Sequence, residues 1–321
     1  MEYNSPSDLK TILHSKRANI YYLEHCRVLV NGGRVEYVTE EGNRSLYWNI
    51  PIANTTTIIL GTGTSLTQSA ARELSKAGVL VGFCGGNGTP LFLANETEVE
   101  CVWFTPQSEY RPTEYLQAWV QIFFDEQLRL TAAKRFQAVR FSQVVKNWNA
   151  LSSEKEEPFT VNIGELKNLI ERTSENISRS SSSGDVLALE ATFSKALYRL
   201  ASAGVSYGSF SRAKRGTGMD PANRFLDHGN YLAYGLGATA AWVLGIPHSL
   251  SVLHGKTRRG GLVFDIADLI KDAVVLPNAF IAAMAGDDNQ EFRQRCTDAF
   301  QKIGALDVMI DSVKEVAQGV K

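Results

Sequence analysis

The sequence predicts an α+β protein, with a small N-terminal β domain over residues 1–104 and a larger helical domain over residues 105–321. Residues 18–103 contain short runs rich in β-branched and aromatic side chains, separated by turn residues. After Pro106 and Pro112 the apolar residues recur with the 3.6-residue period of amphipathic helices. A chain of 321 residues with 44% hydrophobic content can bury one large core or two modest ones.

Strands are expected in the N-terminal domain over residues 20–23, 26–30, 34–38 and 47–51. The turn signals Asn31-Gly32-Gly33 and Glu41-Gly42-Asn43 separate them at hairpin spacing. Helices are expected over residues 115–148, 165–174, 185–202, 225–244, 264–276 and 289–303. Residues 152–158 and the serine-rich residues 178–184 are interpreted as mobile loops between helices.

The glycine-containing segment at residues 61–65 follows an apolar run and precedes a helical run, which is the order found in nucleotide-binding units. The match is poor, because Leu66 stands where a third glycine is needed and no Gly-Lys-Ser/Thr sequence is present. We interpret the segment as a tight turn into a helix capped by Thr64 or Ser65. A nucleotide-binding enzyme that uses residues 61–65 is an alternative function.

The charge balance gives no bulk attraction to polyanions. Lys plus Arg number 33 and Asp plus Glu 34, a net charge of −1. Any contact with nucleic acid must therefore come from a local basic patch. The longest apolar stretch, residues 231–246, is short for a membrane span and is interrupted by Gly235 and Gly237. We expect a core helix there and no membrane partner.

The four cysteines give no sign of a zinc knuckle or a disulfide framework. Cys26, Cys84, Cys101 and Cys296 are widely separated and form no Cys-x-x-Cys pair. The N-terminus has no basic segment followed by an apolar one. Both features fit a protein of the reducing cytoplasm.

Residues 251–269 hold the densest group of candidate functional side chains. Asp265 and Asp268 are three residues apart on a predicted helix, which places their Cβ atoms about 5–6 Å apart on one face. Two such carboxylates repel unless a cation lies between them. The alternative is that Asp265 interacts with a helix N-terminus while Asp268 is solvated. Apolar neighbours favour burial of at least one carboxylate, which then needs a partner.

His254 and Glu190 could complete a metal site with Asp268. His254 follows an apolar run and precedes a glycine, so its imidazole can project into a cleft, although a lone histidine is more often structural. Glu190 borders the apolar stripe of a predicted helix, where exposure is an equally good interpretation. If the three converge, they form an oxygen-rich site with one imidazole that suits Mn²⁺ or Mg²⁺. Such an ion supports phosphodiester chemistry.

Two basic clusters indicate a DNA substrate, although each alone is as well explained by a solvated charge run. The clusters consist of Lys256, Arg258 and Arg259 beside the histidine, and of Arg212, Lys214 and Arg215. Arg side chains and backbone amides of glycine-containing loops suit phosphate oxygens. No base-reading motif is present, so contacts mainly to the sugar-phosphate backbone are expected.

Four segments resemble the CRISPR-associated spacer-acquisition integrase and endonuclease family, specifically its type I-F branch. They are Leu-Glu-Ala-Thr-Phe-Ser-Lys at 189–195, Asp-Pro-Ala-Asn-Arg-Phe-Leu-Asp at 220–227, the segment around His254, and Phe-Asp-Ile-Ala-Asp-Leu at 264–269. The resemblance extends over essentially the whole chain. The spaced Glu, His and Asp motifs are together far more specific than any one of them.

The resemblance implies a helical catalytic domain in which Glu190, His254 and Asp268 bind the metal and Asp265 is a supporting acidic residue of the site. It adds Arg224, from the second segment, to the DNA-binding candidates. The implied reaction is transesterification, in which the 3′ hydroxyl of a captured DNA fragment attacks a phosphodiester at the edge of a CRISPR repeat. With water, or in reverse, the same chemistry cleaves double-stranded or branched DNA.

The resemblance also implies partners. Members form homodimers and assemble with a small CRISPR adaptation protein, which in type I-F systems is fused to the helicase-nuclease, in the cytoplasm of a prokaryote. The alternative from a different functional class is a non-catalytic DNA-binding scaffold of an adaptation complex. Such a scaffold would bind DNA without metal and would be unaffected when Glu190 is neutralised.

Overall fold

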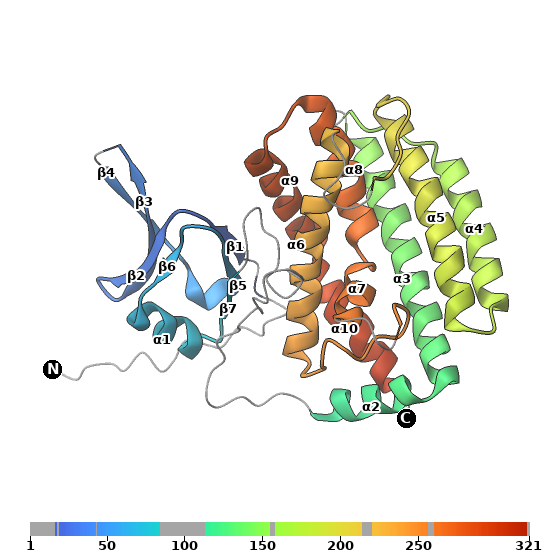
Figure 1. Ribbon diagram of the computed structural model, residues 1–321, viewed down its shortest axis with the longest axis horizontal. Coiled ribbons are helices and arrows are strands. Elements are labelled where there is room, and N and C mark those ends of the chain that lie inside the picture. Colours follow the sequence, from blue (N-terminus) through green and yellow to red (C-terminus); the bar gives the residue numbers. More distant parts are fainter. Residues whose placement is uncertain are drawn as a thin grey trace. The chain divides into compact units, whose positions relative to one another are not determined.

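The computed structural model describes residues 17, 19–42, 44–83, 113–154, 158–213, 220–255 and 260–319. The chain forms two compact units, Met1–Tyr110 and Arg111–Lys321, whose elements are labelled in Figure 1. Strands come first and helices follow, which confirms the predicted α+β class. The predicted boundary between residues 104 and 105 lies outside the described residues. No helix in the described ranges combines the length and apolar character needed to cross a membrane.

The N-terminal unit contains two sheets. Its elements are β1 (Asn19–Leu23), β2 (Arg27–Asn31), β3 (Arg34–Glu41), β4 (Arg44–Asn49), a 3₁₀ turn (Ile52–Asn54), β5 (Thr55–Leu60), β6 (Ser65–Leu66), helix α1 (Gln68–Lys76) and β7 (Leu80–Phe83). Strands β2, β3 and β4 form the expected antiparallel hairpins, and β6 joins β2 in parallel. The second sheet, in the order β1-β5-β7, is parallel.

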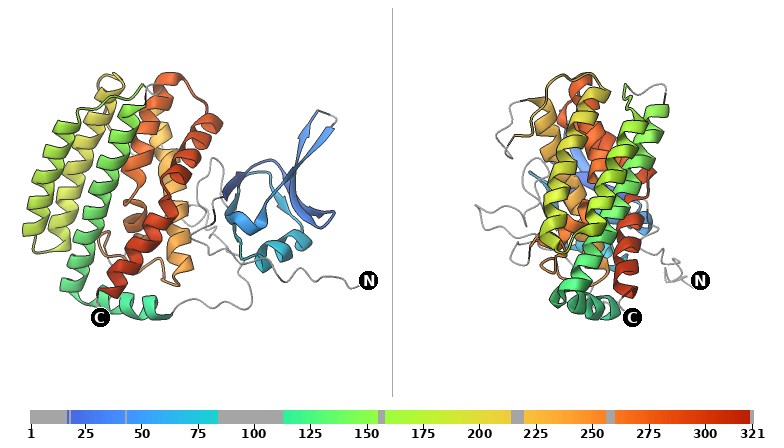
Figure 2. Two further views of the ribbon diagram at one scale, coloured as in Figure 1. Left: turned by 180° about the vertical axis from the view of Figure 1, so that it is seen from behind. Right: turned by 90° about the vertical axis from the view of Figure 1, so that its right-hand side faces the viewer.

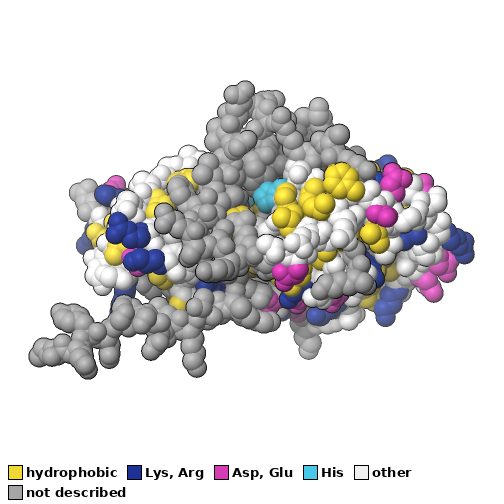
Figure 3. All heavy atoms as spheres, turned by 90° about the horizontal axis from the view of Figure 1, so that it is seen from below, with side chains coloured by type: hydrophobic (Ala, Val, Ile, Leu, Met, Phe, Trp, Pro, Cys, Tyr) yellow, Lys and Arg dark blue, Asp and Glu magenta, His cyan; other side chains and the backbone are white. Residues whose placement is uncertain are grey.

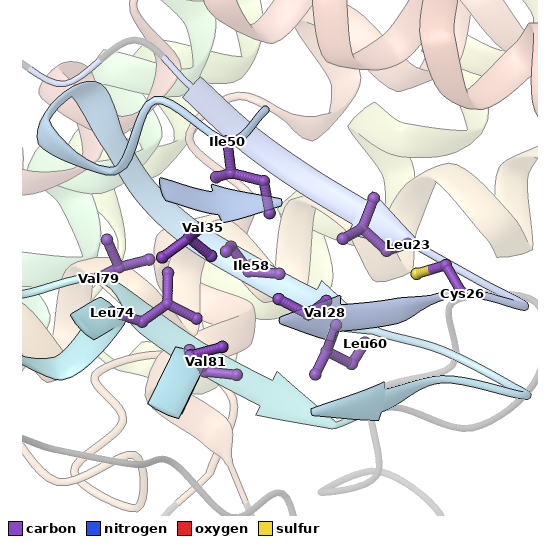
Figure 4. Packing of buried hydrophobic residues seen from close by; sticks show 11 residues of the cluster. Leu23, Cys26, Val28, Val35, Ile50, Ile58, Leu60, Leu74, Val79 and Val81 are labelled. Atoms are coloured by element: carbon purple, nitrogen blue, oxygen red, sulfur yellow. The ribbon is translucent and has the colours of Figure 1, made fainter. Parts of the chain in front are cut away.

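Local sequence explains the first hairpin and the core of this unit. Gly32 and Gly33 both have positive φ values, 55° and 80°, which a tight two-residue turn between β2 and β3 requires. Apolar side chains from both sheets and from α1 pack in one cluster (Figure 4). Val28, Ile58 and Leu74 of this cluster are fully buried.

The glycine segment at residues 61–65 does not form a helix start. Ser65 begins strand β6, and α1 is capped instead by Thr67, whose side chain accepts from the backbone N–H of Ala70. The predicted cap at Thr64 or Ser65 was therefore wrong, because β6 pairs with β2 before the helix begins. A Cβ on Gly61 would lie 2.7 Å from the Glu24 side chain. A carboxylate this close to the turn disfavours a bound phosphate there.

The second unit is helical. Its elements are α2 (Thr113–Phe124), α3 (Glu126–Ser153), α4 (Ile163–Arg179), α5 (Ser183–Gly204), α6 (Pro221–Val243), α7 (Gly261–Ala267), α8 (Lys271–Ala285), α9 (Asn289–Lys302) and α10 (Ala305–Gln318). Helices α3, α4 and α5 lie side by side (Figure 2). Helix α8 contacts α3, α5, α6 and α9, and its residues from Asp272 to Ala282 are all buried, so it lies in the core of the unit.

Two helix predictions and one loop prediction differ from the structure. The predicted helix over residues 115–148 is two helices, because Asp125 ends the first and caps α3 by accepting from the N–H groups of Gln127 and Leu128. The predicted helix over residues 264–276 is likewise divided into α7 and α8. The serine-rich residues 178–184 belong mostly to helix ends, since Ser182 and Asp185 form the capping box of α5. Only residues 180–182 link α4 to α5.

Helix α6 approaches α7 so closely that a glycine is needed between them. A Cβ on Gly237 would lie 2.7 Å from the carbonyl oxygen of Val263 and 3.3 Å from the backbone nitrogen of Ala267, and backbone atoms cannot rotate away. We expect Gly237→Ala to lower the free energy of unfolding by about 1–3 kcal/mol, measured by urea denaturation. The control is Gly184→Ala, where the nearest atom lies 3.6 Å away. An equal loss in both variants would contradict the close approach.

The described cysteines are buried thiols. Cys26 and Cys296 are free, and burial raises the pKa of both. Cys84 and Cys101 lie outside the described residues.

Candidate metal centre

The predicted acidic residues come from three places in the helical unit. Glu190 lies on α5, Asp265 lies within α7, and Asp268 follows the last residue of α7. They are 9%, 2% and 3% exposed, respectively. The alternative of a solvated Asp268 is thus wrong, and Asp265 is too far along α7 to act at its N-terminus. A buried carboxylate is costly unless hydrogen bonds or opposite charges compensate it.

Asp265 is compensated by the loop that carries His254. Its carboxylate accepts from the backbone N–H groups of Val252 at 2.6 Å, Leu253 at 3.2 Å and His254 at 3.1 Å. Its Oδ1 also lies 2.7 Å from His254 Nδ1. In the neutral imidazole, a proton on Nδ1 makes this contact a hydrogen bond to the carboxylate and leaves Nε2 with a lone pair. Asp265 therefore sets both the position and the tautomer of His254.

The free nitrogen of His254 faces Asp268, with Nε2 3.8 Å from Asp268 Oδ2. Burial alone would lower the pKa of His254, but the hydrogen bond to Asp265 and the charges of Asp268 and Asp265 outweigh burial and the opposing charge of Lys271. The net effect is a raised pKa. Metal-binding histidines commonly have this arrangement, in which one ring nitrogen contacts a carboxylate and the other is available to the metal.

Neutralising Asp265 should weaken metal binding without removing a metal ligand. We expect Asp265→Asn to raise the Kd for Mn²⁺ by about 10–100-fold, because the imidazole loses its orienting carboxylate. Isothermal titration calorimetry measures the effect. The matched control is Asp298→Asn, because Asp298 on α9 accepts a hydrogen bond from Gln294 at the surface. Unchanged Mn²⁺ affinity in Asp265→Asn would show that His254 orientation does not matter for binding.

Glu190 is held by an arginine that the sequence analysis missed. Arg140 of α3 is 1% exposed and donates from Nη1 to Glu190 Oε1 at 2.8 Å and from Nε to Asp272 Oδ2 at 2.8 Å. Ser194 donates to the same Oε1 at 2.9 Å and accepts from Arg140 Nη2 at 2.7 Å. Both hydrogen bonds to Glu190 use Oε1, so within the described residues Oε2 is left for another ligand.

The sequence does carry a signal for Arg140. It falls on the stripe of α3 that buries Ala133, Phe136, Val144 and Trp148, where a charged side chain needs a partner. Burial alone would raise the pKa of Glu190, but the positive charges of Arg140 and Lys271 and the hydrogen bonds from Ser194 and Arg140 lower it to about 2. Glu190 is therefore ionised at neutral pH.

Asp268 forms an ion pair with Lys271, the first residue of α8. Neither carboxylate oxygen of Asp268 accepts a hydrogen bond of good geometry from the described residues, although both are buried. Burial alone would lower the pKa of Lys271, but the negative charges of Asp268, Asp272 and Glu190 and the nearby Tyr234 hydroxyl raise it. The Lys271 ammonium is thus charged and lies within electrostatic reach of Glu190, His254 and Asp268.

The donor set fits a divalent metal. In the described part of the chain no three His, Cys, Asp or Glu side chains are close enough together to form a metal site as they stand. However, Asp268 has two buried oxygens without hydrogen bonds, and His254 Nε2 faces one of them at 3.8 Å. A cation bound between them would satisfy all three atoms after a small movement. Oxygen donors with one imidazole suit Mn²⁺ or Mg²⁺.

Comparison with known proteins identifies the family. The family model described as CRISPR associated protein Cas1 matches residues 21–282. The chain belongs to the Cas1 family. The resemblance inferred from the sequence motifs is thereby confirmed.

Two relatives indicate the branch of the Cas1 family. The CRISPR-associated endonuclease Cas1 of Pectobacterium atrosepticum is 66% identical over 98% of this chain and 96% of its own. The protein of the same name from Pseudomonas aeruginosa is 62% identical over 99% of this chain and 98% of its own. Both genera have type I-F systems, in agreement with the predicted branch.

The fold also resembles that of a solved structure described as a casposase bound to integration product. The TM-score is 0.68, with 15% sequence identity over 94% of this chain and 91% of the other. At this identity the likeness supports the Cas1 fold alone. The order of a β-rich unit followed by a helical unit is thus shared with a distant protein.

The predicted DNA-binding residues of this Cas1 protein are only partly described. Lys214, Arg215, Lys256, Arg258 and Arg259 lie outside the described residues. Arg212 contacts α6, where it donates to Asn223 Oδ1 at 2.7 Å and forms an ion pair with Asp227. Arg224 is exposed on α6, with its guanidinium 5.1 Å from the centre of the Phe225 ring. Arg212 is thus held against α6 while still partly exposed, and Arg224 is exposed.

The described surface of the helical unit is not uniformly basic. On the face shown in Figure 3, Lys and Arg side chains lie interspersed with Asp and Glu. This mixture agrees with the net charge of −1 and with the expectation that any DNA contact is local.

Proposed function

We propose that this chain is a divalent-metal-dependent DNA endonuclease and integrase of CRISPR adaptation. The observation that carries the proposal is the approach of His254 Nε2 to Asp268 Oδ2 at 3.8 Å, both largely buried. Glu190, also buried, is ion-paired with Arg140. The name endonuclease, borne by relatives that are 66% and 62% identical, supports an enzyme over a non-catalytic scaffold.

The side chains of this chain have distinct roles in the proposed site. Glu190, through Oε2, His254, through Nε2, and Asp268 would hold the ion, and Asp265 would orient His254. Arg140 would fix Glu190 by occupying its other oxygen. When bound, the ion supplies a Lewis acid for the phosphate and lowers the pKa of an attacking hydroxyl or water. The imidazole makes Mn²⁺ a better fit than Mg²⁺, which prefers an all-oxygen shell.

The proposed reaction exchanges one phosphodiester for another. The 3′ hydroxyl of a DNA fragment attacks a phosphorus atom at the edge of a CRISPR repeat, a new P–O bond forms, and the bond from that phosphorus to the 3′ oxygen of the preceding nucleotide breaks. That oxygen takes up a proton as the attacking hydroxyl loses one, so no oxidant or energy source is needed. With water as the nucleophile, the same steps cleave DNA.

The proposed partners follow from the Cas1 family and from the site. DNA, double-stranded or branched, would be bound by backbone contacts from Arg224 and the basic residues at 214–215 and 256–259. The casposase whose fold is similar is described with an integration product. We further propose a homodimer in the prokaryotic cytoplasm that assembles with the small adaptation protein, in type I-F systems fused to the helicase-nuclease.

The proposal is tested by cleavage and strand transfer on a labelled branched DNA with Mn²⁺, Mg²⁺ or a chelator. Wild type is compared with Glu190→Gln, which keeps the shape of the side chain and can still accept from Arg140 and Ser194. The control is Glu165→Gln, because Glu165 is an exposed residue of α4. We expect metal-dependent activity that is lost only in Glu190→Gln. DNA binding without metal and without cleavage in any variant would favour the scaffold.

A further inference from the structure

We propose that Lys271 occupies the metal position in the metal-free protein and that binding of the divalent ion displaces its ammonium group. The inference rests on the proposed metal site. It concerns a residue outside the predicted ligand set, and it explains why the ligands are present without forming a closed site.

The contacts of Lys271 place its ammonium among the proposed ligands. Its Nζ forms an ion pair with Asp268 Oδ1, and its side chain is 17% exposed. The other oxygen of Asp268 is the one that faces His254 Nε2 at 3.8 Å. Lys271 therefore pairs with one proposed ligand, Asp268, at the point where that ligand approaches a second one, His254.

The charge balance of the site leaves room for a divalent cation. Among the described residues the site contains four buried carboxylates, of Glu190, Asp265, Asp268 and Asp272, and two cations, Arg140 and Lys271. The buried carboxylates thus outnumber the cations by four to two. An ion between Asp268 and His254 would lie next to Lys271 and be repelled by its ammonium.

Of the two cations of the site, Lys271 and Arg140, only Lys271 is free to move. Lys271 is the first residue of α8, where the positive end of the helix dipole disfavours a lysine, so the ion pair with Asp268 holds it there. Its four-carbon side chain is flexible and reaches partly exposed surface. Arg140 is held by Glu190, Ser194 and Asp272 at once and is 1% exposed. A metal ion that takes Asp268 therefore releases Lys271 and not Arg140.

The first test is Mn²⁺ affinity, measured by calorimetry on the full chain. We expect Lys271→Met to lower the Kd for Mn²⁺ by roughly tenfold or more, because the competing ammonium is gone. Lys271→Arg keeps the charge and should not bind Mn²⁺ more tightly than wild type. The control is Lys302→Met, which removes an exposed lysine that pairs with Glu154 at 2.5 Å. If Lys271→Met does not fold without metal, Lys271→Gln replaces it.

The second test detects the movement itself. Lys271 should resist acetylation by an N-hydroxysuccinimide ester in chelator and become reactive when Mn²⁺ is bound, as measured by peptide mass spectrometry. Equal protection with and without Mn²⁺, or weaker Mn²⁺ binding in Lys271→Met, would overturn the displacement of Lys271 while leaving the metal site intact. Failure of the wild-type protein to bind Mn²⁺ would instead overturn the proposed function.

Discussion

Replacing Arg140 by methionine is expected to lower the free energy of unfolding by about 3–5 kcal/mol, the cost of leaving a buried ion pair without one partner. Arg140 contacts two buried carboxylates, of Glu190 and Asp272, and its loss leaves both without their main positive charge. Methionine fills a similar volume, so the loss of stability measures mainly the missing charge and only slightly a change in packing. Urea denaturation in chelator measures the change.

Two controls separate the charge effect from a general effect of substitution. Arg199→Met removes a guanidinium that is 75% exposed and lies 3.5 Å from Glu165, and such surface pairs contribute about 0–1 kcal/mol. The double variant Arg140→Met with Glu190→Gln should recover part of the stability, because one unpaired carboxylate is removed. A loss in Arg140→Met no larger than in Arg199→Met would contradict the buried network.

Removing either of two proposed ligands is expected to abolish strand transfer. His254→Ala and Asp268→Ala should each reduce the rate more than about 100-fold, beyond the 10–100-fold expected for residues that only support ligands. The fold should be retained even though Asp268→Ala removes the ion pair with Lys271, because the Lys271 side chain is 17% exposed and can turn toward solvent. A gel assay measures transfer, and circular dichroism checks the fold.

The control for this pair is Asp298→Ala, which removes an exposed carboxylate of α9. It should transfer strands at the wild-type rate. Turnover at the wild-type rate in His254→Ala or Asp268→Ala would remove that residue from the site.

The sequence predicts the parts of the fold that depend on local pattern. The strands at residues 19–49 and the helices α4, α5, α6 and α9 follow from period and turn signals. Helix α10 carries an equally clear stripe in Leu306, Met309, Ile310, Val313 and Val316, so that signal was present and not used. The parallel pairing of β1 with β5 and β7 joins strands distant in sequence, which local pattern cannot indicate.

The candidate site likewise contains some contacts that the sequence indicates and others that only the folded structure creates. Asp265 and His254 are eleven residues apart, and their contact is suggested by that short spacing. Arg140 is 50 residues from Glu190 and 132 from Asp272, so only the packing of α3 against α5 and α8 brings them together. Lys271 was overlooked although it stands three residues after Asp268, because helix spacing alone gives it a surface role as readily as a buried one.

The central claim is that Glu190, His254 and Asp268 bind one divalent metal ion. The most direct measurement is anomalous diffraction at the manganese edge from crystals of the full chain grown with Mn²⁺. We predict an anomalous peak within about 2.5 Å of Glu190 Oε2, His254 Nε2 and a carboxylate oxygen of Asp268. The account would be contradicted if the protein were active while its manganese ion lay elsewhere and the three side chains were still arranged around Lys271.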